Sequence, residues 1–312
     1  MTFRQSGLLR QLQLYPTQTV AASFVIVALF GSILLLTPWA SQGPRVAWVD
    51  AFFTATSAVC VTGLTVVDTG TTYTFFGQLV ILGLIQAGGL GIMTFSVILV
   101  LFSGRRISVY GRIITELTFT PHPEVQIYSL LRTIIGATLA IEATGAMLLY
   151  IFSPDRGVFS AVFHAVSAFC NAGFSLFSDN LCRFRGHLGV NLVITTLIVI
   201  GGLGFYVVFE CLRYRPWRPG SRLSLHTKTV LSVTAGLLLA GTVVIYFLEA
   251  NNLLKGLPLG ERILASYFQS VTPRTAGFNT LDLSQATTAT LLFMVLLMFV
   301  GASPGSTGGG VK

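Results

Sequence analysis

One short sequence motif occurs three times in this chain. Residues 57–64 read SAVCVTGL, residues 167–174 read SAFCNAGF, and residues 271–278 read VTPRTAGF. In each copy the last residue but one is a glycine, and successive glycines lie slightly more than one hundred residues apart. A repeat of this length in an apolar chain indicates one structural unit copied around an axis. Loops from such copies can build one ion site that no single copy forms.

The composition indicates an integral membrane protein. Of the 312 residues, 53% are hydrophobic and 10% are charged, whereas a soluble domain carries about 25% charged residues. Since a spanning helix needs about 20 apolar residues, we expect spans at 17–37, 77–102, 133–152, 190–212, 229–248 and 286–302. The first stretch is expected to be a span and not a cleaved signal peptide, because no small-residue cleavage site ends it.

The net charge of +8 follows the expected membrane topology. Basic residues gather near the N-terminus, in 105–132 and in 213–228, whereas most acidic residues lie in the loops between them. By the positive-inside rule the basic segments, including the N-terminus, are expected to be cytoplasmic. The lipid bilayer therefore accounts for the charge, and no nucleic-acid partner is expected.

The cysteines and other reactive residues indicate no enzyme. The four cysteines form no CxxC pair, so neither a disulfide framework nor a metal site is expected. The glycine-rich C-terminal stretch lacks the Gly-Lys-Ser/Thr order of a phosphate-binding loop. No catalytic triad or zinc-ligand spacing occurs in a plausible site.

Each copy predicts a membrane–pore–membrane unit: an apolar span, a short apolar segment, the glycine motif, a polar turn and a second span. The short segments 50–59, 158–169 and 261–271 cannot cross a bilayer and predict re-entrant half-helices. Acidic residues at or near their starts (Asp50, Asp155, Glu261) suit helix N-termini, so the negative ends of the helix dipoles face the motifs. The expected organisation is repeat 1 at 1–102, a cytoplasmic linker at 103–128, repeat 2 at 129–212, a basic cytoplasmic linker at 213–228 and repeat 3 at 229–312.

The three motifs have the composition that a cation filter needs. Backbone carbonyls replace the hydration shell of K⁺ without adding fixed charge, and glycine permits the backbone turn that points them one way. The alternative is that each glycine only caps its half-helix, but three in matching context favour a filter. The predicted ion-binding residues are Cys60, Val61, Thr62, Gly63, Cys170, Asn171, Ala172, Gly173, Arg274, Thr275, Ala276 and Gly277.

Two ionisable residues occupy apolar surroundings. Arg274 stands where the other copies have Cys60 and Cys170, and it would repel a cation if it faced the axis. We expect it to turn back and to pair with an acid or with carbonyls behind the filter. Glu142 is the one carboxylate well inside a predicted span, which makes it either a functional residue or a buried partner for Arg274 or for helix carbonyls.

The second spans also carry glycines at corresponding points. In the first two repeats, at 86–91 and 200–204, we expect these glycines to allow close helix packing. The third repeat has too many glycines and prolines at 301–310 to remain helical. Because broken backbone at membrane depth is tolerated only where it is buried or lines a water-filled cavity, this segment is a candidate gate. Its residues are Gly301, Ser303, Pro304, Gly305, Ser306, Thr307, Gly308, Gly309 and Gly310.

At these residues the chain resembles the Trk/Ktr/HKT superfamily of K⁺ transporters, most closely its KtrB-type membrane subunits. The resemblance is carried by 52–64, 84–91, 270–279 and 301–310. It implies an all-α fold of four membrane–pore–membrane units around a pseudo-fourfold K⁺ path, with one filter glycine per unit and an intramembrane gating loop at 301–310. A Ser at the first filter position accompanies Na⁺ transport in HKT relatives, so Gly63 favours K⁺. The resemblance also implies a homodimer on a cytosolic ring of nucleotide-binding, KtrA/TrkA-like regulatory subunits, in the cell (inner) membrane.

The resulting prediction is K⁺ uptake across the plasma membrane through a carbonyl-lined filter that the glycine-rich loop gates. Three of four expected units are present and the third stops in its second span, so we expect a C-terminal truncation and a fourth unit beyond Lys312. K⁺ is the expected transported ion, with Na⁺ as a second possibility and no organic cofactor. The alternatives are a Na⁺-selective or poorly selective cation channel and a non-conducting membrane scaffold whose glycines serve helix packing.

Overall fold

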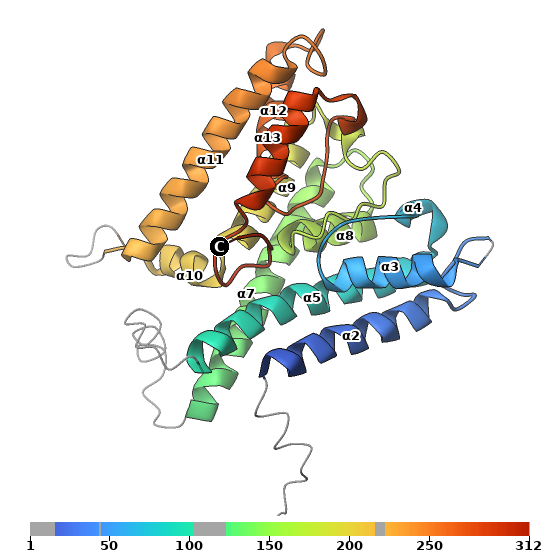
Figure 1. The fold of residues 1–312 in the computed structure, drawn as a ribbon, viewed down its shortest axis with the longest axis vertical. Coiled ribbons are helices and arrows are strands. Elements are labelled where there is room, and N and C mark those ends of the chain that lie inside the picture. Colours follow the sequence, from blue (N-terminus) through green and yellow to red (C-terminus); the bar gives the residue numbers. More distant parts are fainter. Residues whose placement is uncertain (1–15, 44, 103–122, 216–221, 312) are drawn as a thin grey trace, which may run out of the picture.

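A computed structural model describes residues 16–43, 45–102, 123–215 and 222–311 (Figure 1). The regular structure within these residues is helical, with only two isolated β-bridges beside it. In chain order the helices are α2 (Pro16–Leu35), α3 (Trp48–Val59), α4 (Thr69–Thr72), α5 (Phe75–Phe102), α7 (Pro123–Phe152), α8 (Val158–Phe169), η1 (Cys182–Phe184), α9 (Leu188–Leu203), α10 (Phe205–Arg213), α11 (Leu225–Glu249), α12 (Leu259–Val271), η2 (Leu283–Gln285) and α13 (Thr288–Phe299).

One arrangement of a long helix, a short helix and a second long helix recurs three times. The copies are α2–α3–α5, α7–α8–α9 and α11–α12–α13, and in each the first helix packs against the short one. Figure 1 shows the first copy at one end of the molecule, the third at the opposite end and the second between them. Neighbouring copies meet where α5 packs on α8 and α9 packs on α12. The predicted all-α fold of membrane–pore–membrane units is confirmed.

The short helices agree with the predicted re-entrant segments. α8 has the predicted bounds, while α3 and α12 each begin two residues earlier than predicted. Asp50 and Glu261 lie in the first turns of α3 and α12, as expected. Asp155 lies three residues before α8, near its start as expected, but the extended backbone of Gly157 forms the N-cap, so this helix has no acidic residue in its first turn.

The first and second long helices of a unit approach closely at glycines. A Cβ added to Gly31 of α2 would lie 2.6 Å from the Leu84 side chain of α5, and one added to Gly145 of α7 would lie 2.7 Å from the Leu197 side chain of α9. The two contacts occupy equivalent places in the first and second copies. Small residues therefore set the helix spacing, as is common in membrane bundles.

Two long helices deviate from the predicted spans. The predicted span 190–212 is broken, because α9 and α10 meet at an angle of 103° at Gly204. The backbone of Gly204 has φ +85° and ψ 148°, which no α-helix can contain, so the glycines here do more than allow close packing. In the third unit α13 ends at Phe299, short of the predicted boundary at 302.

Several described helices are long and apolar enough for a membrane. Arg132–Phe152 and Leu225–Glu249 are each long and apolar enough to cross a membrane. The bent pair α9–α10 is long and apolar enough if its two helices are counted as one span. Large apolar side chains are exposed on the outer helices, whereas the fully buried aromatic side chains lie in the short helices or in the loops that follow them: Tyr73, Phe163, Phe174, Phe268 and Phe278. This distribution places the solvent-excluded core around the short helices. The predicted linkers 103–128 and 213–228 fall partly outside the described residues, and α7 already begins at Pro123.

Candidate functional site

Each short helix runs directly into a loop with the same unusual backbone. After α3, α8 and α12, the motif glycine and the residue two positions before it both have positive φ: 55° and 76° at Val61 and Gly63, 59° and 71° at Asn171 and Gly173, and 70° and 79° at Thr275 and Gly277. A non-glycine residue in this region costs about 1–2 kcal/mol. Such strain, repeated at three equivalent places, is typical of a functional site.

The short helices themselves hold these loops in place. The residue before each glycine donates its backbone N–H to a carbonyl of the preceding helix end: Thr62 to Ser57 at 3.0 Å, Ala172 to Ser167 at 2.7 Å and Ala276 to Thr272 at 3.0 Å. These bonds satisfy helix-terminal carbonyls that would otherwise have no partner. They also leave the glycine at the outer end of each turn.

Hydroxyl groups fix the far side of the turn in two of the units. The Ser167 hydroxyl donates to the carbonyl of Phe174 at 2.8 Å, and the Thr272 hydroxyl donates to the carbonyl of Phe278. Both carbonyls belong to the residue after the motif glycine. In the first unit the Thr62 hydroxyl instead donates to the Ser57 hydroxyl at 3.0 Å, so the three loops are not fastened identically.

The three motif glycines meet at one point. A Cβ added to Gly63 would lie 3.2 Å from the Cα of Gly173, and one added to Gly173 would lie 2.8 Å from the Cα of Gly277. A Cβ added to Gly277 would lie 3.1 Å from the Cα of Gly173 and 3.9 Å from that of Gly63. The structure thus brings together residues more than two hundred positions apart, at the place where three half-helix C-termini end.

The segment 301–310 lies against these loops as non-helical chain. Its ends are paired with each other, because Ala302 donates its N–H to the carbonyl of Gly309 at 3.0 Å and Gly301 donates to Val311 at 3.1 Å. Its middle is bonded to the α9–α10 break: Ser303 donates to Gly202 at 3.0 Å, and Phe205 donates to Gly305 at 3.2 Å. In Figure 1 the C-terminal stretch accordingly lies beside α10.

Thr307 connects this segment to the second filter loop. Its Oγ1 accepts a hydrogen bond from Nδ2 of Asn171 at 2.9 Å and donates to the carbonyl of Phe169 at 3.2 Å. A Cβ added to Gly308 would also lie 2.4 Å from Oγ1 of Thr275, in the third filter loop. The candidate gate and the candidate filter are therefore in direct contact.

Among the described residues, the expected pairing of Arg274 with an acid or with carbonyls is not seen. Its side chain lines a small cavity behind the loops with Val199, Gly202 and Leu238, and its Nε is buried without a hydrogen-bond partner. The ion pairs among the described residues are Arg183–Asp179 and Arg185–Glu261, and neither involves Arg274. The other side chains that line this cavity are apolar, among them Val199, Leu238 and Ala302.

Glu142 is buried elsewhere and is no partner for Arg274. Its side chain is 4% exposed. The carboxylate accepts from Nε2 of Gln86 at 3.1 Å and from the Cys170 thiol at 3.8 Å. The carboxylate therefore lies directly behind the second filter loop.

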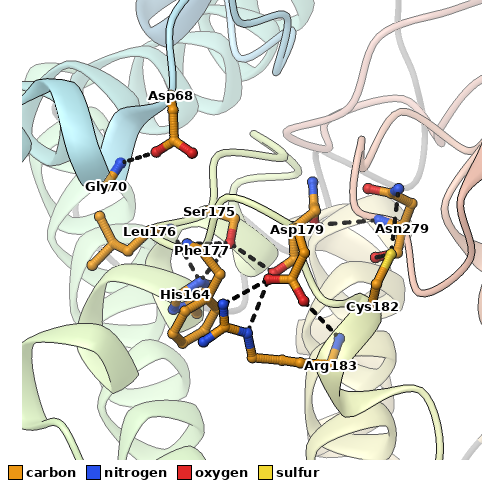
Figure 2. A network of polar contacts seen from close by, with 11 residues as sticks. Asp68, Gly70, His164, Ser175, Leu176, Phe177, Asp179, Cys182, Arg183 and Asn279 are labelled. Carbon is orange, nitrogen blue, oxygen red and sulfur yellow. Dashed lines mark hydrogen bonds and ion pairs between the residues drawn. The ribbon is translucent and has the colours of Figure 1, made fainter.

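The acidic residues after the motif glycines cap turns on the side of the loops away from the gate. Asp68 accepts from the N–H groups of Gly70 and Thr71, and Asp179 accepts from the N–H of Arg183 and pairs with its guanidinium (Figure 2). The hydroxyl and N–H of Ser284 donate to Asp282 and lower its pKa, so this exposed group stays negatively charged. The negative charge at this mouth favours an approaching cation.

The second and third units are also tied together at this mouth, as Figure 2 shows. Leu181 donates its N–H to the carbonyl of Asn279 at 3.1 Å, and Asn279 donates its own N–H to Oδ1 of Asn180 at 3.3 Å. Below them His164 of α8 is buried, with Nδ1 2.7 Å from the carbonyl of Ser160 and Nε2 3.0 Å from the hydroxyl of Ser175. His164 therefore has a packing role.

Two contributors to the site were not predicted from the sequence. The glycines of 200–204 were expected to allow helix packing, although this stretch breaks the helix and contacts the candidate gate. Asn171 was expected to contribute its carbonyl only, although its side chain makes the contact with Thr307. The available signal was an amide at a position where the other units have Val61 and Thr275.

Known proteins share this architecture. The family model described as TrkH, cation transport protein, matches residues 10–312. The chain is 41% identical to the Ktr system potassium uptake protein B of Bacillus subtilis over all of its own length and 71% of that protein. It is 39% identical to the potassium/sodium uptake protein NtpJ of Enterococcus hirae over 96% of this chain and 67% of that protein.

A solved structure shows the same fold. The potassium transporter TrkH from Vibrio parahaemolyticus matches with a TM-score of 0.68 and 20% sequence identity. The match covers 92% of this chain and 58% of the solved chain. This chain thus spans well under two thirds of that structure.

Proposed function

Because the chain belongs to the TrkH family of cation transport proteins, we propose that it takes up K⁺ across the plasma membrane. The ion passes the point where Gly63, Gly173 and Gly277 meet. The observation that carries this proposal is the convergence of three strained glycine loops from three units. A single capping glycine needs no such meeting point. The potassium uptake named for the Bacillus subtilis relative supports the choice of ion.

The proposed filter acts through the backbone of 60–63, 170–173 and 274–277. Carbonyl oxygens of these loops replace the hydration water of K⁺. The C-terminal ends of α3, α8 and α12 carry partial negative charge toward the same point, which favours a cation. A membrane potential supplies about 2.3 kcal/mol per charge for each 100 mV, so uptake needs no chemical step.

We propose 301–310 as the gate of this path. Its contacts with both the second and third filter loops support this role, as does its lack of helical structure. Its contacts with the filter loops and the α9–α10 break include hydrogen bonds to backbone groups and to the side-chain amide of Asn171. A segment held in this way can leave the path without disrupting the apolar core.

A second candidate function is uptake with little discrimination between K⁺ and Na⁺. The observation that favours it is the name of the Enterococcus hirae relative, a potassium/sodium uptake protein. Gly63 argues for K⁺, since the resemblance associates serine at this position with Na⁺ transport. Competition between the two ions separates the candidates.

The proposed setting is the cell (inner) membrane, with the N-terminus and the basic segments on the cytoplasmic side. The proposed assembly is a homodimer on a cytosolic ring of nucleotide-binding regulatory subunits. The name "Ktr system" of the 41% identical relative supports a multi-component system. The basic segments 105–132 and 213–228 are the parts of this chain nearest to such a ring in the proposed topology.

The test is K⁺ uptake by cells that lack their own K⁺ uptake systems. The cells express either this chain or this chain continued beyond Lys312 by a fourth membrane–pore–membrane unit from a relative. We expect growth at low K⁺ and K⁺ uptake that a tenfold excess of Na⁺ reduces little. Uptake that Na⁺ suppresses in proportion to its concentration would favour the poorly selective channel. Absence of uptake in both forms, with protein present in the membrane, would favour the scaffold.

A further inference from the structure

A buried polar cluster joins the first and second units behind the filter. Glu142 of α7, Gln86 of α5 and Cys170 of the second filter loop form it. Each carboxylate oxygen of Glu142 has one partner: Oε2 accepts from Gln86 and Oε1 accepts from the Cys170 thiol. Glu142 is 4% exposed and Cys170 is 1% exposed. The carboxylate therefore links a helix of one unit to the filter loop of the next.

The backbone of α5 packs closely against the residues around this cluster. A Cβ added to Gly89 would lie 2.6 Å from Sγ of Cys170, and one added to Gly88 would lie 2.0 Å from the carbonyl of Val59. One stretch of α5 thus contacts both the end of α3 and the second filter loop. The Cys170 side chain therefore cannot move toward α5 unless the helix also shifts.

The equivalent place between the second and third units has different chemistry. Gly145 and Gly241 are equivalent positions of α7 and α11, and three residues before them stand Glu142 and Leu238. In the same register Val199 replaces Gln86, and Arg274 replaces Cys170. Val199, Leu238 and Arg274 line one cavity. The three equivalent residues therefore lie close together at both unit interfaces. Only the first interface has a hydrogen-bonded carboxylate there.

We propose that Glu142 is a positioning residue for the ion path. Its carboxylate, held between Gln86 and the Cys170 thiol, fixes the second filter loop against the first unit and so contributes to the discrimination between K⁺ and Na⁺. This inference rests on the proposed function, because it assigns Cys170–Gly173 to the filter. Glu142 acts through Cys170 and does not touch the ion.

The first test compares ion discrimination in four variants. Glu142→Leu gives α7 the residue that α11 has at this place, and Cys170→Ala removes the thiol donor. Both are expected to lower the ratio of K⁺ to Na⁺ uptake roughly three- to tenfold, the effect of one lost hydrogen bond of ordinary net strength. Cys170→Ser keeps a donor and is expected to retain most of the ratio. The control Thr144→Val removes a hydroxyl of α7 that bonds only to Ala140 of its own helix and is expected to change nothing.

The double variant Glu142→Leu/Cys170→Ala is expected to resemble the single ones, because both remove the same interaction. Uptake is expressed per amount of protein in the membrane, so lower expression does not mimic lost discrimination. A wild-type ratio in both Glu142→Leu and Cys170→Ala would overturn the inference. So would a loss in Cys170→Ser equal to that in Cys170→Ala.

A second test does not depend on transport. In a protein with Cys60, Cys182 and Cys211 changed to serine, Cys170 is the one remaining cysteine. We expect a membrane-permeant maleimide to modify it roughly threefold faster or more when Glu142→Leu is added, because the loop is then less firmly held. Thr144→Val is expected to leave the rate unchanged. Equal rates with and without Glu142→Leu would overturn the inference even if the protein transports K⁺.

The two tests keep the proposals apart. If the unsubstituted protein moves no K⁺, the proposed function fails and with it the role in ion discrimination, while the labelling rate still decides whether Glu142 holds the loop of Cys170. If it moves K⁺ selectively and the Glu142 variants keep both selectivity and labelling rate, only the role of Glu142 fails.

Discussion

Glycine is required at the three motif positions for two separate reasons. The backbone has positive φ at Gly63, Gly173 and Gly277, which other residues adopt only at a cost. In addition, a Cβ at any of them would come into close contact with the backbone of a neighbouring filter loop. The first reason concerns the turn of each loop, and the second concerns the point that the loops share.

Gly63→Ser separates these two effects. It is expected to lower the ratio of K⁺ to Na⁺ uptake by roughly tenfold, because its Cβ would lie 2.4 Å from the carbonyl of Ala172 and displace a second filter loop. The control is Gly43→Ser, which also has positive φ, +96°, but has no atom within 4 Å of an added Cβ. Measurement of both ion fluxes in the complemented cells checks the prediction. An unchanged ratio of K⁺ to Na⁺ uptake in Gly63→Ser would contradict the proposed filter.

Thr307 gives a prediction for the gate. Thr307→Val keeps the shape of the side chain but removes the hydroxyl that joins Asn171 and the carbonyl of Phe169. We expect K⁺ flux to rise roughly two- to tenfold, because one or two hydrogen bonds that hold the segment are lost. Ser232→Ala is the control, since that hydroxyl bonds only within α11. A flux equal to or below that of the parent would contradict the gate.

At the scale of elements, the sequence predicted the half-helices well and the broken helix poorly. Length and apolar composition were enough for α3, α8 and α12, because a segment of this length cannot cross a bilayer. The break at Gly204 depends on a partner: the non-helical turn is stabilised where Phe205 donates to Gly305, one hundred residues away. Glycine in a span signals both close packing and a break, and only the tertiary contact decides between them.

Gly204→Ala is expected to loosen the gate from the α9–α10 break. Its φ of +85° is costly for alanine, and the added Cβ would lie 2.8 Å from the carbonyl of Pro304. We expect K⁺ flux to rise toward the level reached when 305–309 are deleted, a change that itself should raise flux. Gly83→Ala, with open space around its Cβ, is the matched control. If both the deletion and Gly204→Ala leave flux unaltered or lower, 301–310 is no gate.

At the scale of the whole molecule, the repeat of one motif was the strongest predictor of architecture. It predicted three equivalent units, and the equivalent contacts of Gly31 and Gly145, and of Gly88 and Gly201, bear out the similarity of the first two. The differences in polar contacts between the units could not be predicted from the sequence. Whether Glu142 or Arg274 has a polar neighbour depends on which side chains the packing of α5, α7, α9 and α11 brings together.

The orientation in the membrane gives a prediction for the molecule as a whole. One protein carries Thr71→Cys, at the exposed outer mouth, with all four native cysteines replaced. A second retains only Cys211, which is exposed near the basic end of α10. We expect a membrane-impermeant maleimide to modify Thr71→Cys in intact cells and Cys211 only after permeabilisation. Permeabilised cells show that both sites react. The reverse pattern in intact cells would contradict the proposed topology.

The position of the bound ion tests the central claim most directly. Tl⁺ substitutes for K⁺ and scatters anomalously, so its place can be measured in crystals of the protein carrying a fourth unit. We expect the strongest anomalous peak where Gly63, Gly173 and Gly277 meet, beside the carbonyls of the filter loops, and its loss when excess K⁺ is added. Tl⁺ peaks only at other places, in crystals where these loops are well defined, would contradict the account.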